Sequence, residues 1–241
     1  MRLDWPDCHN ARDVGGLPTA SGGRVRRGAL IRSDVLDRLT PAGLASVRGY
    51  GVSRIIDLRS VEEVAEIPGP FAADAIYRNI PLIDEQADRH RDPVAEATML
   101  ATYMGSIDRN GRRIAAGVAA VAGAPPGAVV VHCAAGKDRT GLLVALMLRA
   151  VGVADADIAA DYALSAEYLR ERYAAELAEA PSATDQEKIR EGQRCDPNTI
   201  LGTLAHVDTR HGGTVAYLGS VGLSDRQLAL LRTRLLGGGG L

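Results

Sequence analysis

One ten-residue segment, 132–141, contains the residue types that phosphate chemistry needs. It reads HCAAGKDRTG, so that Cys133 is followed six positions later by Arg139. A loop whose backbone N–H groups turn inward at the start of a helix forms an anion-binding nest. A cysteine at the beginning of such a nest is expected to ionise to a thiolate, which is a strong nucleophile. The segment therefore predicts a nucleophile beside a bound oxyanion.

The other residues of this loop suit the same task. The planar guanidinium of Arg139 can bind two phosphate oxygens at once. The hydroxyl of Thr140 can donate a hydrogen bond to the sulfur, and Gly136 and Gly141 let the backbone approach a ligand and a strand closely. We predict that the phosphate is bound by the loop residues Ala134, Ala135, Gly136, Lys137, Asp138, Arg139 and Thr140.

A departing alkoxide or phenolate needs a proton, so a general acid is expected near the cysteine. Asp57 follows a predicted strand and can point into the same cleft, or it can form an ion pair with Arg59. Asp138 lies in the loop itself, where it can serve as the acid or orient Arg139. Asp7, in a WPD tripeptide at the N-terminus, lies far upstream of the nucleophile and is interpreted as a coincidence. The candidate catalytic residues are thus Cys133, Arg139, Asp57 and Asp138.

Three further features around the loop have a functional and a structural interpretation. Lys137 is one of only two lysines in the chain, and its ammonium group can bind a second phosphate of the substrate or pair with Asp138. His132 is expected to fix the loop by hydrogen bonds rather than act as a base. The arginines at 24, 26 and 27 are interpreted as a solvated turn.

The elements that must position these residues alternate along the chain. The β-branched run 129–131 predicts a central strand, and the apolar segment 141–151 predicts a buried helix after the loop. We predict further strands at 52–58 and 76–82. Further helices are predicted at 41–50, 94–121 with a break near 110–111, from 155, at 197–212 and at 224–237. This order indicates an α/β fold with a central, mostly parallel sheet flanked by helices, and ligands bind beyond the carboxyl ends of such strands.

The bulk composition fits a single globular domain spanning residues 1–241 and excludes several other classes. The net charge is −2, which gives no indication of a nucleic-acid partner. Three widely spaced cysteines make a poor disulfide framework, and with the scattered histidines they give no metal-site pattern. The uncharged stretch 114–136 contains Pro125, Pro126 and four glycines, so it is not read as a membrane span.

The two ends of the chain and one charged segment carry separate expectations. Residues 1–13 lack the apolar core of a signal peptide, so a cytoplasmic location is expected, with export by another route left open. The segment 166–192 is helical in composition and is either a helical lid or insertion over the cleft or a packed outer hairpin. The tail 237–241 is expected to fray.

The loop and several other segments resemble a known family. The spacing from Cys133 to Arg139 and Thr140 resembles the signature of the protein tyrosine phosphatase superfamily, and the full segment 132–141 resembles a bacterial tyrosine-phosphatase-like branch with dual-specificity and phosphoinositide-directed members. The segments NARDVGG at 10–16, RGALIRS at 27–33 and DLRS at 57–60 are similar to motifs of that branch. Ala11 and Ile31 stand where the branch usually has aromatic residues.

The resemblance implies a cysteine-dependent phosphomonoester hydrolase that forms a phosphocysteine and releases inorganic phosphate without a metal or organic cofactor. The expected substrate is a phosphorylated protein, at tyrosine or with dual specificity, or a phosphoinositide. The branch also suggests Asp57 as the acid and Lys137 as a ligand of the substrate. It further suggests a pair between Arg12 and Asp13 that braces the site, for which a structural turn is the favoured alternative. The alternatives are a rhodanese-like sulfurtransferase and an inactive phosphate-binding module.

Overall fold

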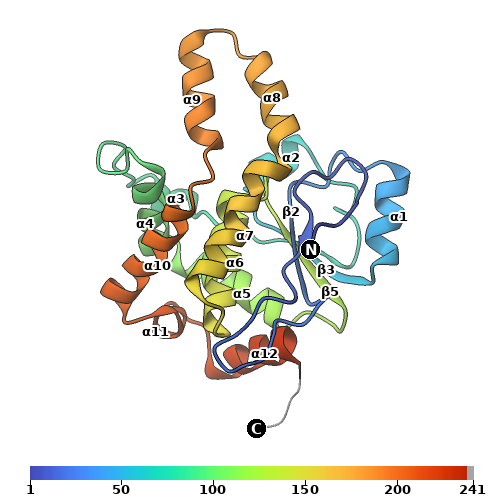
Figure 1. The fold of residues 1–241 in the computed structure, drawn as a ribbon, viewed down its shortest axis with the longest axis vertical. Helices are drawn as coiled ribbons and strands as arrows, with labels where there is room; N and C mark the ends of the chain where they lie inside the picture. The colour runs from blue at the N-terminus through green and yellow to red at the C-terminus, as the bar shows by residue number, and fades with distance from the viewer. Residues whose placement is uncertain (238–241) are drawn as a thin grey trace.

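A five-stranded sheet forms the centre of the computed structural model, which describes residues 1–237 (Figure 1). The strand order is β1-β2-β5-β3-β4. Only the β1–β2 pair is antiparallel, and the other three pairings are parallel. The strands are β1 (Arg12–Asp13), β2 (Leu30–Ser33), β3 (Val52–Asp57), β4 (Tyr77–Asn79) and β5 (Ala128–His132). The predicted α/β fold with a mostly parallel sheet is confirmed.

The register of the sheet brings three polar residues to one edge. His132, the last residue of β5, pairs with Ser33 of β2 on one side and with Asp57 of β3 on the other. All three strands run parallel, so their carboxyl ends open at the same edge. The nucleophile loop that follows β5 is therefore flanked by the segments that follow β2 and β3.

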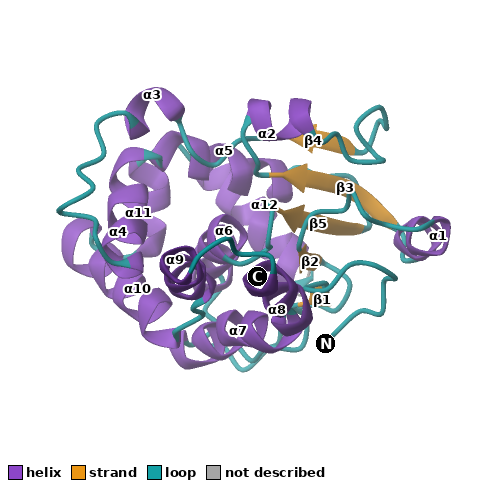
Figure 2. Ribbon diagram, turned by 90° about the horizontal axis from the view of Figure 1, so that it is seen from above, coloured by secondary structure: helices purple, strands orange, loops and turns teal. Residues whose placement is uncertain are grey.

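The helices cover the two faces of the sheet unequally, as Figure 2 shows. Most helices lie on one side, with α5, α6 and α12 nearest the sheet, while α1 lies on the opposite side. The alternating side chains of β5 serve both faces, since Val129 and Val131 belong to the larger core cluster and Val130 to the smaller one. This double burial explains why β5 is an uninterrupted β-branched run.

The first half of the chain forms short helices whose ends follow from the sequence. Thr40, with Pro41 at the first helical position, caps the first helix, and Ser60 forms a capping box with Glu63. The break at 110–111 separates two helices as predicted. The helices are α1 (Pro41–Gly49), α2 (Val61–Glu66), α3 (Glu85–Asp88), α4 (Met99–Arg109) and α5 (Gly111–Ala122).

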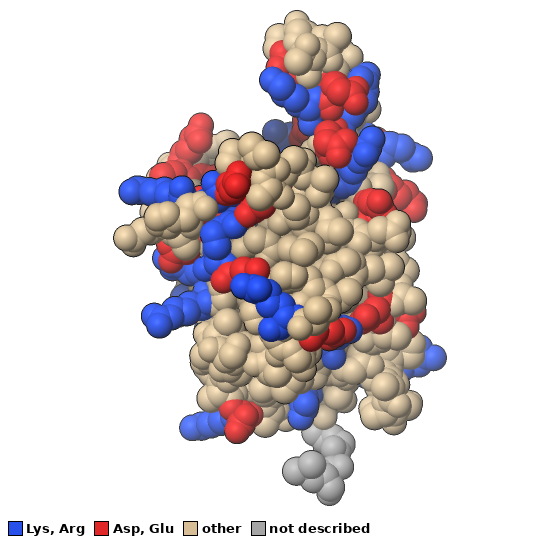
Figure 3. Space-filling view, turned by 90° about the vertical axis from the view of Figure 1, so that its left-hand side faces the viewer, with Lys and Arg blue, Asp and Glu red and all other residues tan. Residues whose placement is uncertain are grey.

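The second half is helical after β5. The helix that follows the loop, α6, is buried along almost its whole length. Its successors include α8 and α9, a hairpin that projects from the body and carries interspersed charges of both signs (Figures 1 and 3). The helices are α6 (Asp138–Ala150), α7 (Asp155–Tyr168), α8 (Arg170–Ala178), α9 (Ala183–Gln193), α10 (Pro197–His211), α11 (Thr214–Ser220) and α12 (Asp225–Leu236).

Some element boundaries differ from the sequence prediction. The strand expected at 76–82 is only three residues long, and Pro81 lacks the N–H that a longer ladder would need. The helix expected from 94 begins at Met99, after Thr98 as its cap. The frayed tail predicted at 237–241 lies, apart from Gly237, outside the described residues. In the part of the chain that is described, no helix has both the length and the apolar character needed to cross a bilayer.

Candidate active site

The loop between β5 and α6 turns its carbonyl groups outward. The carbonyl oxygen of Ala134 accepts from the backbone N–H of Val35 at 3.0 Å, and that of Ala135 accepts from the Asn10 amide at 2.9 Å. The N–H groups of residues 134–137 donate no hydrogen bond to any described residue. Cys133 lies at the start of this loop with only 3% of its surface exposed. These N–H groups therefore have no partner among the described residues, which is what an anion-binding nest requires.

Gly136 makes the turn of the loop feasible. Its backbone φ is +66°, a conformation that side chains with a Cβ rarely adopt. A Cβ atom at this position would also collide with the backbone carbonyl of Ser33. The loop can therefore pack directly on the end of β2 only because residue 136 is glycine.

A buried ionic network supports the loop from beneath. Arg32 of β2 donates to the carbonyl oxygen of Gly136 at 2.8 Å and to the carboxylate of Asp161 at 2.8 Å. The other oxygen of Asp161 accepts from Arg12 at 2.9 Å, and Arg12 also donates to Asn10. Both arginines are 1% exposed. Burial alone would raise the pKa of Asp161, but the two guanidiniums lower it, so the carboxylate stays ionised.

The predicted pair between Arg12 and Asp13 is therefore wrong. The two residues are neighbours in β1, and their side chains point to opposite faces of the sheet. Arg12 pairs with Asp161 of α7, while Asp13 accepts from the backbone N–H groups of Gly15 and Gly28, each at 2.8 Å. Asp13 thus shapes the turn before β2, and Arg12 is the residue that supports the loop.

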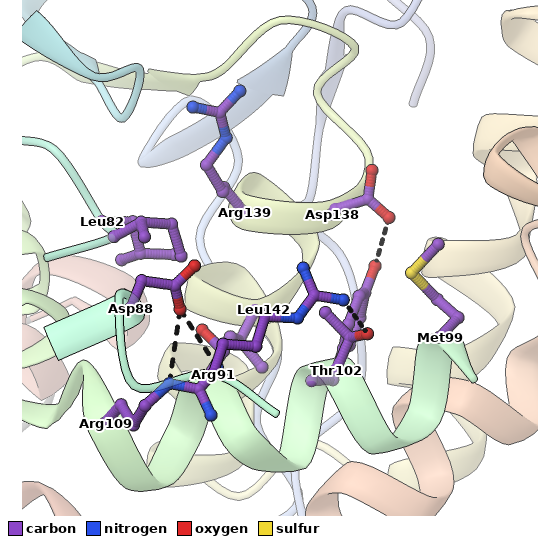
Figure 4. A pocket seen from close by; sticks show the side chains of 12 residues that line it. Leu82, Asp88, Arg91, Met99, Thr102, Arg109, Asp138, Arg139 and Leu142 are labelled. Atoms are coloured by element: carbon purple, nitrogen blue, oxygen red, sulfur yellow. Dashed lines mark hydrogen bonds and ion pairs between the residues drawn. The ribbon is translucent and has the colours of Figure 1, made fainter. Parts of the chain in front are cut away.

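Arg139 is held in a defined orientation by Glu63 of α2. Both terminal nitrogens of Arg139 donate to the two carboxylate oxygens of Glu63, one of them at 2.8 Å. Burial alone would lower the pKa of Arg139, but its hydrogen bonds to the Glu63 carboxylate and the nearby Cys133 sulfur raise it. The guanidinium is therefore fully charged and lies close to the nucleophile. In Figure 4 its side chain extends away from Asp88 and Arg109.

Asp138 occupies the first turn of α6 at the edge of a cavity. Its Oδ1 accepts a hydrogen bond from the hydroxyl of Tyr103 at 2.6 Å, drawn as a dashed line in Figure 4. Burial and the neighbouring carboxylate raise the pKa of Tyr103, so its hydroxyl remains a donor. The Asp138 side chain is 39% exposed and can reach a substrate that enters the cavity.

Asp57, the other candidate acid, is fully buried and fully engaged. Its carboxylate accepts from the Arg59 guanidinium at 2.8 Å and 3.1 Å and from the Tyr77 hydroxyl at 2.9 Å. Burial opposes ionisation, but His132 and Arg59 together lower the pKa of Asp57. The ion pair with Arg59, one of the two interpretations of this residue, is the arrangement that the structure contains.

His132 lies between Asp57 and the nucleophile loop. Its Nε2 is 3.7 Å from the carboxylate of Asp57, and its Nδ1 is 3.3 Å from the carbonyl oxygen of Cys133. Burial lowers the pKa of His132. A neutral, hydrogen-bonded imidazole in this position fixes the start of the loop, as expected.

Two loop side chains lack a role that the sequence offered them. The Lys137 ammonium group lies 3.3 Å from the Asp138 carboxylate, so the predicted pair with Asp138 is formed. It also donates to the carbonyl oxygens of Gly192 and, at 3.0 Å, Arg194, so it is not free to bind a second phosphate, the other interpretation. Because the lysine is fully buried, its charge needs such partners. The hydroxyl of Thr140 has no hydrogen-bond partner within residues 1–237, so the predicted bond to the sulfur is not formed here.

Two cavities meet at the loop. One of about 270 Å³ includes Asp138 and Arg139 in its wall and is otherwise largely apolar. Its apolar lining comes from Leu82, Ile83, Met99, Tyr103 and Leu142. The other, of about 180 Å³, borders the loop at Ala134 and is lined by charged residues, among them Arg38, Arg59, Glu63 and Arg172.

Sequence reasoning missed four residues of this site. Glu63 forms the capping box of α2 and also pairs with Arg139, from which it is separated by 76 positions. Tyr103 and Asp161 lie on helices far along the chain from their partners. Arg172 of α8 donates to the carbonyl oxygen of Ala134 at 3.0 Å and so joins the helical hairpin to the loop. The one local indication for Asp161 is that it is the only acid on the buried face of α7.

Comparisons with known proteins agree with this geometry. The model of a family described as the tyrosine phosphatase family matches residues 3–237. A tyrosine-protein phosphatase of Nostoc commune is 31% identical over an alignment that covers 90% of this chain and 78% of that protein. The triple specificity protein phosphatase PtpB of Mycobacterium tuberculosis is 30% identical, and the alignment covers 97% of this chain and 99% of that protein.

Proposed function

Because the chain belongs to the tyrosine phosphatase family, whose members are phosphoric monoester hydrolases, we propose that it hydrolyses phosphotyrosine through a phosphocysteine on Cys133. One observation carries this proposal. A buried cysteine begins a loop whose carbonyls at 134–136 accept hydrogen bonds from neighbouring segments, while the N–H groups of 134–137 have no partner in the described chain. Arg139, oriented by Glu63, adds a guanidinium beside the sulfur.

The proposed reaction has two steps. The Cys133 thiolate attacks phosphorus in line, and the S–P bond forms as the P–O ester bond breaks. The departing oxygen takes the proton of Asp138. A water molecule then transfers a proton back to Asp138 and attacks phosphorus, which breaks the S–P bond and releases inorganic phosphate. Arg139 and the loop N–H groups stabilise the equatorial oxygens in both steps.

Asp138 is the better candidate for the general acid. Its carboxyl is 39% exposed at the cavity next to Arg139, and only its Oδ1 is engaged, by the Tyr103 hydroxyl at 2.6 Å and the Lys137 ammonium group at 3.3 Å. Asp57 has every acceptor site taken by Arg59 and Tyr77, and its lowered pKa keeps it ionised. A carboxylate in that state has no proton to give at neutral pH.

The apolar cavity favours an aromatic substrate. Its walls of Leu82, Met99 and Leu142 suit a phenyl ring, while Asp138 and Arg139 lie where the ester oxygen and phosphate would be. The charged groups at its far side are already paired, since Arg109 binds both Asp88 and Glu96. With Lys137 also occupied, this cavity offers little to the additional phosphates of a phosphoinositide.

A substrate panel tests the proposal. Phosphotyrosine peptides should be hydrolysed faster than phosphoserine or phosphothreonine peptides and phosphoinositides. Turnover should resist EDTA and be blocked by vanadate. Cys133→Ser should abolish turnover while retaining phosphate affinity, and the control Cys195→Ser should retain activity. Full activity in Cys133→Ser, or sulfur transfer from thiosulfate to cyanide in place of phosphatase activity, would refute the proposal.

A further inference from the structure

Three side chains with metal-binding groups converge on the surface between α4 and α10. Asp108 comes from the last turn of α4, His206 from the middle of α10, and His211 from the end of α10. The Oδ1 atom of Asp108 lies 3.1 Å from the Nε2 of His206 and 3.1 Å from the Nε2 of His211. The three ligand atoms all lie within 4.8 Å of one another.

These separations match those between ligands of a tetrahedral ion. Without an ion, one carboxylate oxygen would have to accept hydrogen bonds from both histidines. Zinc binds histidine nitrogen and carboxylate oxygen at about 2.0–2.2 Å, so neighbouring ligand atoms of a tetrahedral site lie about 3.3 Å apart. Both nitrogen–oxygen distances are close to that value. Two imidazoles and one carboxylate are also a ligand set that first-row transition metals prefer, with a fourth position left for water.

The cluster is held in place by groups around it. The ring of His211 packs on the ring of Tyr217, with 4.9 Å between their centres, and the hydroxyl of Tyr217 donates to the carbonyl oxygen of Ile107 at 2.8 Å. Tyr217 is completely buried. Because Ile107 immediately precedes Asp108, this contact fixes His211 relative to the carboxylate. A preformed arrangement lowers the ordering cost of binding an ion.

The charge of the cluster is also suitable. Asp108 supplies a carboxylate whose Oδ1 faces both histidine nitrogens. Arg210 contacts the other carboxylate oxygen at 3.2 Å. Its side chain is 62% exposed and can move into solvent when a cation binds.

We propose that Asp108, His206 and His211 bind a divalent transition-metal ion of the zinc type, which links the C-terminal part of α10 to α4. The ion would have a structural role, since the α4 residues that line the cavity at Asp138 are different ones, Met99, Thr102, Tyr103, Ser106 and Arg109. The site is independent of the proposed phosphatase reaction, and turnover does not depend on it.

Calorimetry with zinc chloride tests this proposal. The full chain without an affinity tag, carrying Cys133→Ser to remove the reactive thiol, is stripped with EDTA, dialysed and titrated. We expect one ion per chain. At a free zinc concentration about 100 times Kd, the ratio of folded to unfolded protein should rise about 100-fold, seen as a higher Tm. Cobalt should give the visible absorption of a tetrahedral site.

Variants locate the ion. His206→Gln and His211→Gln should each weaken zinc binding at least 10-fold and remove the rise in Tm, whereas the exposed His90→Gln should bind as tightly as the parent protein. The Tm of each metal-free variant is measured to confirm folding, and Asp108→Asn replaces any variant that does not fold. No binding, or binding only at millimolar zinc, would overturn the proposal. So would an affinity equal to that of the parent protein in both histidine variants.

Discussion

Replacing Asp161 by asparagine tests whether the buried network supports the phosphate loop. The carboxylate lies 2.9 Å from Arg12 and 2.8 Å from Arg32, and all three side chains are almost completely buried. Asparagine keeps the shape but removes the charge that balances two buried guanidiniums. Burial lowers the pKa of Arg12 only to about 10, so this cation persists at neutral pH.

The expected loss of stability is large. Removing one partner of a buried ion pair typically costs about 3–5 kcal/mol, because the remaining charge is left uncompensated. We therefore expect the free energy of unfolding of Asp161→Asn in urea to fall by about that amount. The control is Asp155→Asn on the same helix, whose carboxylate is 39% exposed in its pair with Arg149 and whose loss should cost about 1 kcal/mol or less.

The same substitution should also slow turnover. Arg32 holds the carbonyl oxygen of Gly136, so a displaced Arg32 lets the loop shift. A displacement of about 1 Å at a reacting centre can reduce the rate by about 100-fold. We expect kcat for an aryl phosphate, measured where the variant is fully folded, to fall by about 10- to 100-fold. Stability and kcat both within experimental error of the wild type would refute the bracing role.

Acid titration gives an independent check of Asp161. Its pKa in the folded state is lowered below the unfolded value of about 3.9. The stability it contributes is thus fully present above about pH 4 and is lost as the pH falls through the folded-state pKa. The wild type should lose more stability than Asp161→Asn below about pH 4, and parallel curves would contradict the assignment.

Three further substitutions test other parts of the site. Asp138→Asn should lower kcat on a phosphotyrosine peptide by about 10²–10⁴-fold. The loss should be smaller on p-nitrophenyl phosphate, because its leaving group needs little protonation. Equal losses on the two substrates would argue against an acid role. Glu63→Gln should weaken the hold on Arg139 and lower kcat/KM about 10-fold, roughly the loss of 1.4 kcal/mol, and unchanged steady-state kinetics would argue against orientation by Glu63. Lys137→Met should speed amide hydrogen exchange in 170–193 without affecting β5, and unaltered exchange would exclude the proposed link between loop and hairpin.

The sequence allowed good prediction of what is encoded locally. The strand β5, the loop that begins with Cys133 and the helix α6 follow from a β-branched run, a glycine-containing turn and an apolar segment. The break between α4 and α5 at 110–111 was likewise predicted. Each of these features depends mainly on residues within about one helical turn.

Contacts between distant segments could not be predicted. Asp161 meets Arg12 across 149 positions, and Asp108 meets His206 across 98. Which face of α7 or α10 turns inward depends on how the helices pack, and no local pattern encodes it. Lys137 illustrates the same limit, since its type suggested a substrate contact but its carbonyl partners come from the end of α9.

The central claim is that Cys133 carries the phosphoryl group during turnover. Acid quenching during hydrolysis of a phosphotyrosine peptide, followed by mass spectrometry of the digested protein, tests it directly. We expect one phosphoryl group on the peptide that contains Cys133, formed fast enough to account for kcat and absent in Cys133→Ser. Continued turnover with no phosphorylated cysteine, or with the phosphoryl group on another residue, would contradict the account.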